Sequence, residues 1–126
     1  MLQNTLRAAS ASTKYTLTFH VPPSSLESVK RAIFAAGAGR YPGPGNYTEC
    51  CFTTTGTGQF RPGDTANPNI GTVGALEKVE EVKVETLVVG AETVKKAVEA
   101  LKMYVQNYYI GLRNGGEVDM IQSASV

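Results

Sequence analysis

The sequence has 126 residues, a formal net charge of +1 at pH 7 and 42% hydrophobic side chains. This length is typical of one domain, and the hydrophobic content excludes a chain that is disordered throughout. The near-neutral charge excludes the strongly basic surface of nucleic-acid-binding domains, and no apolar run approaches the roughly 18 residues of a membrane span. We therefore expect one globular, cytoplasmic domain without a nucleic-acid or membrane partner.

Residues 1–13 contain no acidic residue, one arginine and several hydroxyl side chains. This composition is similar to that of a mitochondrial transit peptide, although one arginine is thin support. We expect a flexible N-terminal tail over 1–13, with a mitochondrial location as the alternative to the cytoplasm.

Apolar and polar residues alternate over 15–21 and predict a first strand. A proline pair ends the strand. Ser24 then stands three residues before Glu27, which is the spacing of a capping box at the start of a helix. After a run of apolar residues at helical spacing, Gly37 or Gly39 can supply the left-handed residue that ends this helix.

A third strand and a second helix follow later in the sequence, after a second strand and a long irregular segment. A second strand is predicted over 47–55, followed by a Gly-, Pro- and Asn-rich irregular segment over 56–74. Alternating valines predict a third strand over 82–88, and apolar residues at helical spacing predict a helix over 94–101. A short last strand is expected over 104–110.

The element order predicts an α+β fold of the ferredoxin-like βαββαβ type, in which two helices cover one face of an antiparallel sheet. The domain would span 14–110, and 111–126 would be a polar C-terminal tail. Thr16, Thr18 and His20 would lie on the uncovered face of the sheet. A mixed face of this kind often packs against another subunit, so we expect an oligomer.

The chemistry-bearing residues do not form a recognisable catalytic or metal motif. His20 is the only histidine, and a single imidazole lacks the further ligands that zinc requires, so we expect a surface or interface residue. Cys50 and Cys51 would point to opposite faces of a strand, which argues against a disulfide between them. We expect Cys50 in the core and Cys51 at a subunit interface. The sequence predicts no catalytic residue, no metal and no cofactor.

The irregular segment is the first place to look for a binding function, because long irregular segments in compact domains are usually functional or disordered. Gly56-Thr57-Gly58 lacks the Gly-Lys-Ser/Thr ending of a phosphate loop and is better explained as a turn. Arg61 could clamp a carboxylate or phosphate with its planar guanidinium. The structural alternative is an ion pair with an acidic residue of the same or a neighbouring subunit, namely Glu77, Glu80 or Glu85.

Several short motifs follow one another in a fixed order over most of the chain. They are Val21-Pro22, Phe34-Ala35-Ala36-Gly37-Ala38-Gly39, Gly45-Asn46-Tyr47, Cys50, Phe52, Gly56-Thr57-Gly58, Phe60-Arg61-Pro62, Asn67-Pro68, Ile70-Gly71, Gly74, Glu77, Val79-Glu80 and Val84-Glu85. With these motifs the sequence resembles the insertion domain of Nif-three-like (NGG-interacting-factor-three-like) proteins, within the PII-like and CutA-like superfamily. It looks like a stand-alone form of that domain.

The resemblance implies a ferredoxin-like subunit of a homotrimer, with the segment between the second and third strands placed like the signalling loop of PII proteins. The parent proteins hold a metal pair in flanking domains, which this sequence does not include. Their pattern His-Pro-Tyr-Glu-Glu after the second helix is replaced here by Met103-Tyr104-Val105-Gln106-Asn107. The candidate ligand-binding residues are Asn46, Tyr47, Arg61, Asn67, Gly71 and Glu85.

Three functions follow as hypotheses. The favoured one is a non-catalytic, oligomeric module that is regulatory or binds a small ligand, an anion or nucleotide, between subunits. The first alternative is an accessory or catalytic subunit of a nucleotide-hydrolysing or metal-dependent enzyme. The second alternative is a protein–protein interaction module. Fold analogy alone does not decide among them.

Overall fold

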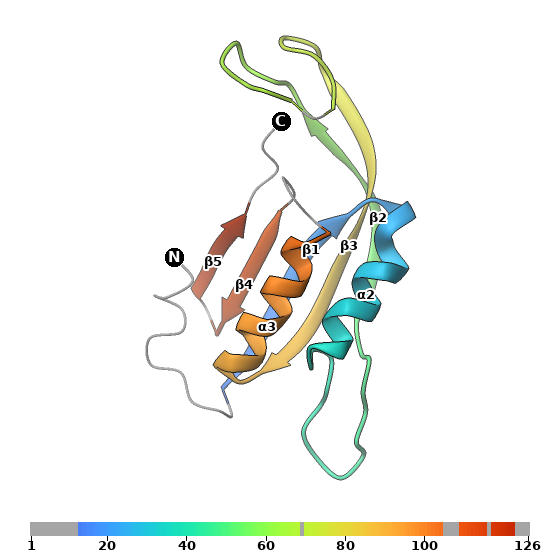
Figure 1. The fold of residues 1–126 in the computed structure, drawn as a ribbon, viewed down its shortest axis with the longest axis vertical. Coiled ribbons are helices and arrows are strands. Elements are labelled where there is room, and N and C mark those ends of the chain that lie inside the picture. The colour runs from blue at the N-terminus through green and yellow to red at the C-terminus, as the bar shows by residue number, and fades with distance from the viewer. Residues whose placement is uncertain (1–12, 69, 105–108, 116, 123–126) are drawn as a thin grey trace.

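The computed structural model describes residues 13–68, 70–104, 109–115 and 117–122. Within these ranges, five strands form one antiparallel sheet in the order β2-β3-β1-β4-β5. Two helices lie side by side across one face of the sheet (Figure 1). The elements are β1 (Lys14–Val21), the short 3-10 helix η1 (Pro23–Ser25), α2 (Leu26–Ala35), β2 (Phe52–Phe60), β3 (Glu77–Val89), α3 (Ala91–Lys102), β4 (Ile110–Asn114) and β5 (Glu117–Gln122). The predicted ferredoxin-like fold is confirmed, with β5 as an addition.

The hydrophobic core lies between the helices and the sheet. Burial along β1 alternates residue by residue, as the sequence predicts for a strand with one covered face. Tyr15, Leu17 and Phe19 are buried against the helices, while Thr16 and Thr18 are half-buried on the other face. The helices contribute apolar residues at helical spacing: Val29 and Ile33 from α2, and Val94, Ala97, Val98 and Leu101 from α3. Among the described helices, none is long and apolar enough to cross a membrane.

The start of α2 differs from the prediction. Ser24 lies inside η1 and does not cap the helix, which begins two residues later at Leu26. Ser25 occupies the cap position and makes no side-chain hydrogen bond there. The preceding proline pair explains the difference, because its carbonyl at Pro22 accepts the backbone N–H of Ser25 at 3.0 Å and closes a tight turn first.

The end of α2 agrees with the prediction. Gly37 has a φ of 111° and donates its N–H to Phe34, and Ala38 donates to Ile33. These two bonds form a Schellman motif, in which a glycine beyond the helix satisfies the last free carbonyls.

The central strands are displaced along the sequence from their predicted positions. β2 occupies Phe52–Phe60 instead of 47–55, and β3 begins at Glu77 instead of residue 82. The glycines at positions 56 and 58 were interpreted as turn residues, yet both pair with β3 in the ladder. Ladder bonds use only the backbone, so glycine can take part in them.

The displaced strands create a projection that we call the arm, residues 56–81. β1 pairs with β3 only from Val82 onward, so the earlier part of β3 pairs with β2 alone. This two-stranded ribbon extends beyond the helices and ends in the loop 61–76, at the top of Figure 1. The irregular segment predicted over 56–74 is therefore a ribbon with a shorter loop.

The structure also differs from the prediction in the C-terminal region. The predicted last strand over 104–110 is replaced by β4, which starts at Ile110; residues 105–108 of that prediction lie outside the described ranges. The segment expected to be a polar tail forms most of β4 and all of β5, joined as an antiparallel hairpin. Ile110 and Leu112 explain this, because both are fully buried against β1 and the helices.

Candidate functional site

The face of the sheet opposite the helices carries polar and charged side chains. The register places Thr18 of β1 beside Glu85 of β3, and His20 beside Lys83. On the other side of β1, Thr16 pairs with Arg113 of β4. The expectation that the polar residues of β1 lie on the uncovered face agrees with their half-burial. The two ion pairs found among the described residues lie on the helices and involve none of these side chains.

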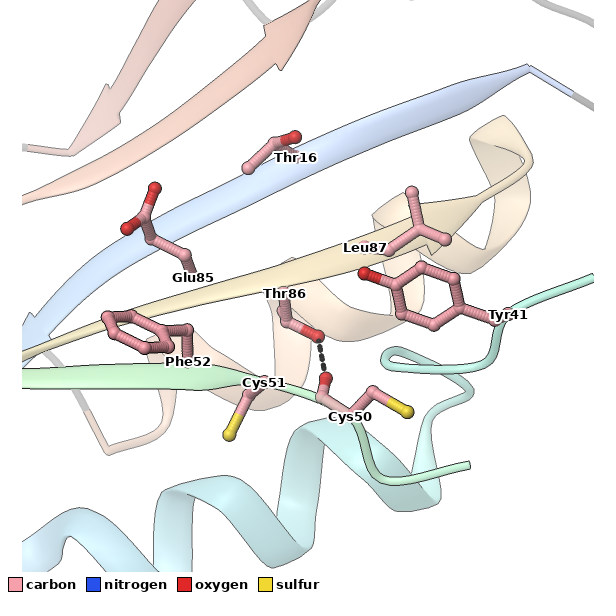
Figure 2. A pocket seen from close by; sticks show the side chains of 8 residues that line it. All are labelled: Thr16, Tyr41, Cys50, Cys51, Phe52, Glu85, Thr86 and Leu87. Carbon is pink, nitrogen blue, oxygen red and sulfur yellow. Dashed lines mark hydrogen bonds between the residues drawn. The ribbon is translucent and has the colours of Figure 1, made fainter. Parts of the chain in front are cut away.

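A first cavity, the aromatic cavity, opens where this face meets the loop between α2 and β2. Its volume is about 340 Å³, within the usual range of roughly 300 to 1,000 Å³ for small-molecule sites. Figure 2 shows Tyr41 and Leu87 on one side of it and Phe52 and Glu85 on the other. Tyr41 is 52% exposed and Phe52 is 68% exposed, so both rings are available to a ligand.

A second cavity, the basic cavity, lies over the middle of the same face and has a volume of about 440 Å³. Its charged and titratable lining residues are His20, Lys83, Glu85, Tyr109 and Arg113. The His20 ring packs against Tyr109 with 5.3 Å between the ring centroids. Thr16 and Glu85 line both cavities, so the two adjoin each other at these side chains.

The aromatic cavity is shaped by hydrogen bonds that tie the α2–β2 loop to β3. Gly39 donates its N–H to Leu87 at 2.7 Å and accepts the N–H of Cys50 at 2.9 Å. Thr86 donates its hydroxyl hydrogen to the Cys50 carbonyl at 2.8 Å. These bonds hold the two ends of the loop against β3 and so bring Tyr41 to the cavity wall.

The structure contradicts the core position predicted for Cys50, whereas the interface position expected for Cys51 stays a prediction. Both precede β2, both are free thiols, and both are half-buried at the aromatic cavity. Cys51 packs against the core, whereas Cys50 is not part of the core cluster and its thiol donates to the Thr48 carbonyl. The assignment of Cys50 to the core was wrong, because β2 starts at Phe52 and not at residue 47. In Figure 2 the two sulfur atoms point away from each other.

The six predicted ligand-binding residues lie in three separate places. Glu85 lines both cavities. Asn46 and Tyr47 are exposed in the loop between α2 and β2, at the bottom of Figure 1. The remaining residues are exposed in the loop of the arm, at the opposite end of the molecule: Arg61, Asn67 and Gly71. One chain therefore does not bring all six together, and their role stays a prediction.

Arg61 has a structural contact of its own. Its Nη1 donates to the Gly74 carbonyl at 2.8 Å, and the Gly74 N–H donates to the Pro62 carbonyl at 2.8 Å. These bonds close the neck of the loop. Neither ion pair of the described structure involves Arg61, so the ion pair considered as its structural alternative does not form among the described residues.

Among the cavity residues that were not predicted as site residues from the sequence, three show why they were missed. Tyr41 belongs to a loop without a periodic pattern, Lys83 belongs to an alternating strand pattern, and Arg113 was placed in the polar tail. Only the alternation around Lys83 carried a usable signal, since it places Lys83 and Glu85 on the same face. Within the described ranges, no group of three or more His, Cys, Asp or Glu side chains could hold a metal ion.

Several bacterial proteins are similar to this chain in sequence. No family model matches the sequence. A protein of Listeria monocytogenes named "GTP cyclohydrolase 1 type 2 homolog" is 44% identical over 90 residues, which are 70% of this chain and 24% of that protein. A protein of the same name from Halalkalibacterium halodurans is 41% identical over 90 residues, 71% of this chain and 23% of that protein. The chain thus spans about a quarter of these relatives.

Solved structures agree with the fold. A Bacillus cereus protein related to NIF3 superposes with a TM-score of 0.64 and 26% identity, covering 98% of this chain and 32% of that one. GlnK of B. subtilis superposes with a TM-score of 0.56 and 14% identity, covering 86% of this chain and 96% of GlnK. The GlnK–ATP complex of B. subtilis superposes with a TM-score of 0.57 and 13% identity, covering 87% of this chain and 95% of the GlnK chain. The chain is thus similar in sequence to about a quarter of the bacterial relatives, and it shares its fold with a NIF3-related protein and with GlnK.

Proposed function

We propose that this chain is a non-catalytic, oligomeric module that binds a nucleotide or similar anion on the uncovered face of its sheet, where copies of the chain meet. One observation carries the proposal: an aromatic cavity and a basic cavity adjoin each other and share Thr16 and Glu85. A nucleotide has the matching composition, because a flat base is joined to a charged phosphate.

The aromatic cavity suits the base. The rings of Tyr41 and Phe52 border it, and Leu87 adds an apolar surface. Stacking on aromatic side chains stabilises a bound base and is tolerant of base identity, since every base has a π-face. The Thr16 hydroxyl offers a polar group at its edge.

The basic cavity suits the phosphate. Lys83 and Arg113 both line it, and neither takes part in an ion pair found among the described residues. Arg can bind phosphate through two parallel hydrogen bonds, and Lys supplies a compact positive charge. His20 adds a further ring nitrogen at the same wall.

An oligomer would complete the site. The half-buried polar face and the outer edges of β2 and β5 lie at positions where another copy can cover or pair with them. The homotrimer is the assembly that PII-like resemblance implies. Residues of the arm, such as Arg61, and of the α2–β2 loop, such as Asn46, can meet one ligand only if different chains contribute them. The solved GlnK–ATP complex supports nucleotide binding by a protein of this fold.

A protein-interaction role is the second candidate. The loop of the arm exposes three large apolar side chains at a distance from the core: Ile70, Val73 and Leu76. Exposed apolar groups that gather on one projection are typical of protein contact sites. Such a role is compatible with ligand binding, because the arm and the cavities use different residues.

Isothermal titration calorimetry with AMP, GMP and inorganic phosphate tests the proposal. The double substitution Lys83→Ala and Arg113→Ala should weaken nucleotide affinity by about tenfold or more, since two charged contacts to phosphate are removed. Lys78→Ala is the matched control, because Lys78 is exposed on the arm and lines neither cavity. Absence of binding by all three compounds would overturn the proposal.

A further inference from the structure

An acidic side chain stands between the two cavities and needs an explanation. Glu85 lines both of them, and a carboxylate there would repel a phosphate placed directly against it. Its side chain is half-buried, and neither ion pair of the described structure uses it. In the register it is flanked by Thr18 of β1 and Phe52 of β2, which cannot neutralise it.

The order of groups in a nucleotide matches the order of residues along this face. The base is joined to the ribose, and the ribose is joined to the phosphate. A base beside Tyr41 and Phe52 and a phosphate beside Lys83 and Arg113 therefore leave the ribose at the shared border. Thr16 and Glu85 are the two residues at that border.

We infer that the Glu85 carboxylate accepts hydrogen bonds from the 2′- and 3′-hydroxyls of a bound ribonucleotide, and so selects ribonucleotides over 2′-deoxyribonucleotides. An ionised carboxylate only accepts hydrogen bonds, and its two oxygens can take two neighbouring hydroxyl donors. Bonds of this kind to a charged acceptor are stronger than neutral ones. The Thr16 hydroxyl adds a partner beside them. The inference rests on the proposed nucleotide function and assigns its specificity.

The competing explanation is an ion pair between Glu85 and a cation of a second copy. That pair would stabilise the assembly and would not distinguish one sugar from another. A comparison of ribose with 2′-deoxyribose ligands separates the two explanations, because these ligands differ only in the 2′-hydroxyl, which is one of the two hydroxyls that Glu85 would bind.

The experiment measures the affinities of AMP and dAMP, and of GMP and dGMP, by calorimetry on the full chain. The unmodified protein should bind each ribonucleotide about tenfold or more tightly than its deoxy counterpart. Glu85→Gln replaces one acceptor oxygen by a donor and should reduce that ratio to near one, mainly by weakening the ribonucleotide. Glu80→Gln is the matched control, since Glu80 is an exposed acid of the same strand that lines neither cavity, and it should keep the ratio.

Each other result has a definite meaning. Equal affinities for ribose and deoxyribose ligands in the unmodified protein would overturn this inference while leaving the proposed function intact. A ribose preference that persists in Glu85→Gln would also overturn it, because the discrimination would come from other residues. No binding of any nucleotide would overturn the inference and the proposed function together.

Discussion

Thr86 on β3 donates its hydroxyl hydrogen to the backbone carbonyl of Cys50, with 2.8 Å between the two oxygens. Thr86 is only 4% exposed. Among the described residues, the other side chains of the buried core are hydrophobic. The bond joins the sheet to the loop that carries Tyr41, across 36 positions of sequence. The geometry of the aromatic cavity therefore depends on a contact made on the buried side of the sheet.

Removal of this bond should destabilise the protein. Thr86→Val keeps the shape of the side chain and deprives the Cys50 carbonyl of its partner. We expect the free energy of unfolding in urea to fall by about 1–2 kcal/mol. Thr53→Val is the matched control: Thr53 is an exposed strand residue, and its substitution should change the value by less than about 0.5 kcal/mol. Equal effects of the two substitutions would contradict a structural role of the bond.

Gly39 should tolerate no side chain. Its φ is 76°, and an added Cβ would lie 2.8 Å from the Cys50 carbonyl oxygen and from a Phe34 ring carbon. Gly39→Ala should lower the free energy of unfolding by about 1–3 kcal/mol more than Gly43→Ala does. Gly43 is a suitable control, since its φ is also positive, at 128°, but its Cβ would meet no atom within 4 Å. Similar unfolding curves for both variants would show that the close contact is relieved at little cost.

The fold could be predicted from the sequence wherever periodicity was strong. The alternation in β1 and the helical spacing in α2 and α3 report directly on which face is buried, and these elements were predicted correctly except for the start of α2. β2 could not be placed in the same way, because Thr and Gly residues on an exposed ribbon show no burial pattern. β5 has the same difficulty, since its place depends on pairing with β4.

The site was less predictable than the fold. Glu85 was selected from the sequence and lies at the border of two cavities. Its neighbours Tyr41 and Arg113 come from a loop and from the C-terminal hairpin, far apart in the sequence. Only the strand order and register bring such residues together, and no local pattern contains that information.

The buried phenol of Tyr15 should make stability depend on alkaline pH. Burial raises the pKa of Tyr15 above its ordinary value of 10.0. The unfolded chain therefore loses this proton at lower pH than the folded protein does. The contribution of Tyr15 to the free energy of unfolding is fully present below pH 10.0. It is lost as the pH rises through the pKa that Tyr15 has in the folded protein.

Tyr15→Phe tests this pH dependence through urea unfolding at pH 7 and above pH 10. The Tyr15 hydroxyl has no hydrogen-bond partner among the described residues, so its removal should raise stability at pH 7 by about 1 kcal/mol. The substitution should also reduce the loss of folding stability above pH 10. Tyr47→Phe changes an exposed phenol and should keep the loss unchanged. An identical alkaline loss in Tyr15→Phe and the unmodified protein would rule out Tyr15 as its source.

Arg61 should hold the loop of the arm closed. Arg61→Ala removes the bond from Nη1 to the Gly74 carbonyl. We expect faster amide hydrogen exchange at Gly74, whose N–H bonds to Pro62, with a change in global stability below about 0.5 kcal/mol. Lys78→Ala removes a positive charge from the same arm without touching the neck and should leave this exchange rate unchanged. Unaltered protection of Gly74 in Arg61→Ala would mean that the neck closes without the guanidinium.

The solution molar mass, measured by light scattering on the purified chain, tests most directly whether copies of the chain cover the open face of the sheet. The chain has a mass of 13.4 kDa. The proposed homotrimer predicts three times this mass at micromolar concentration, with or without added nucleotide. A mass equal to that of a single chain under both conditions would contradict the account.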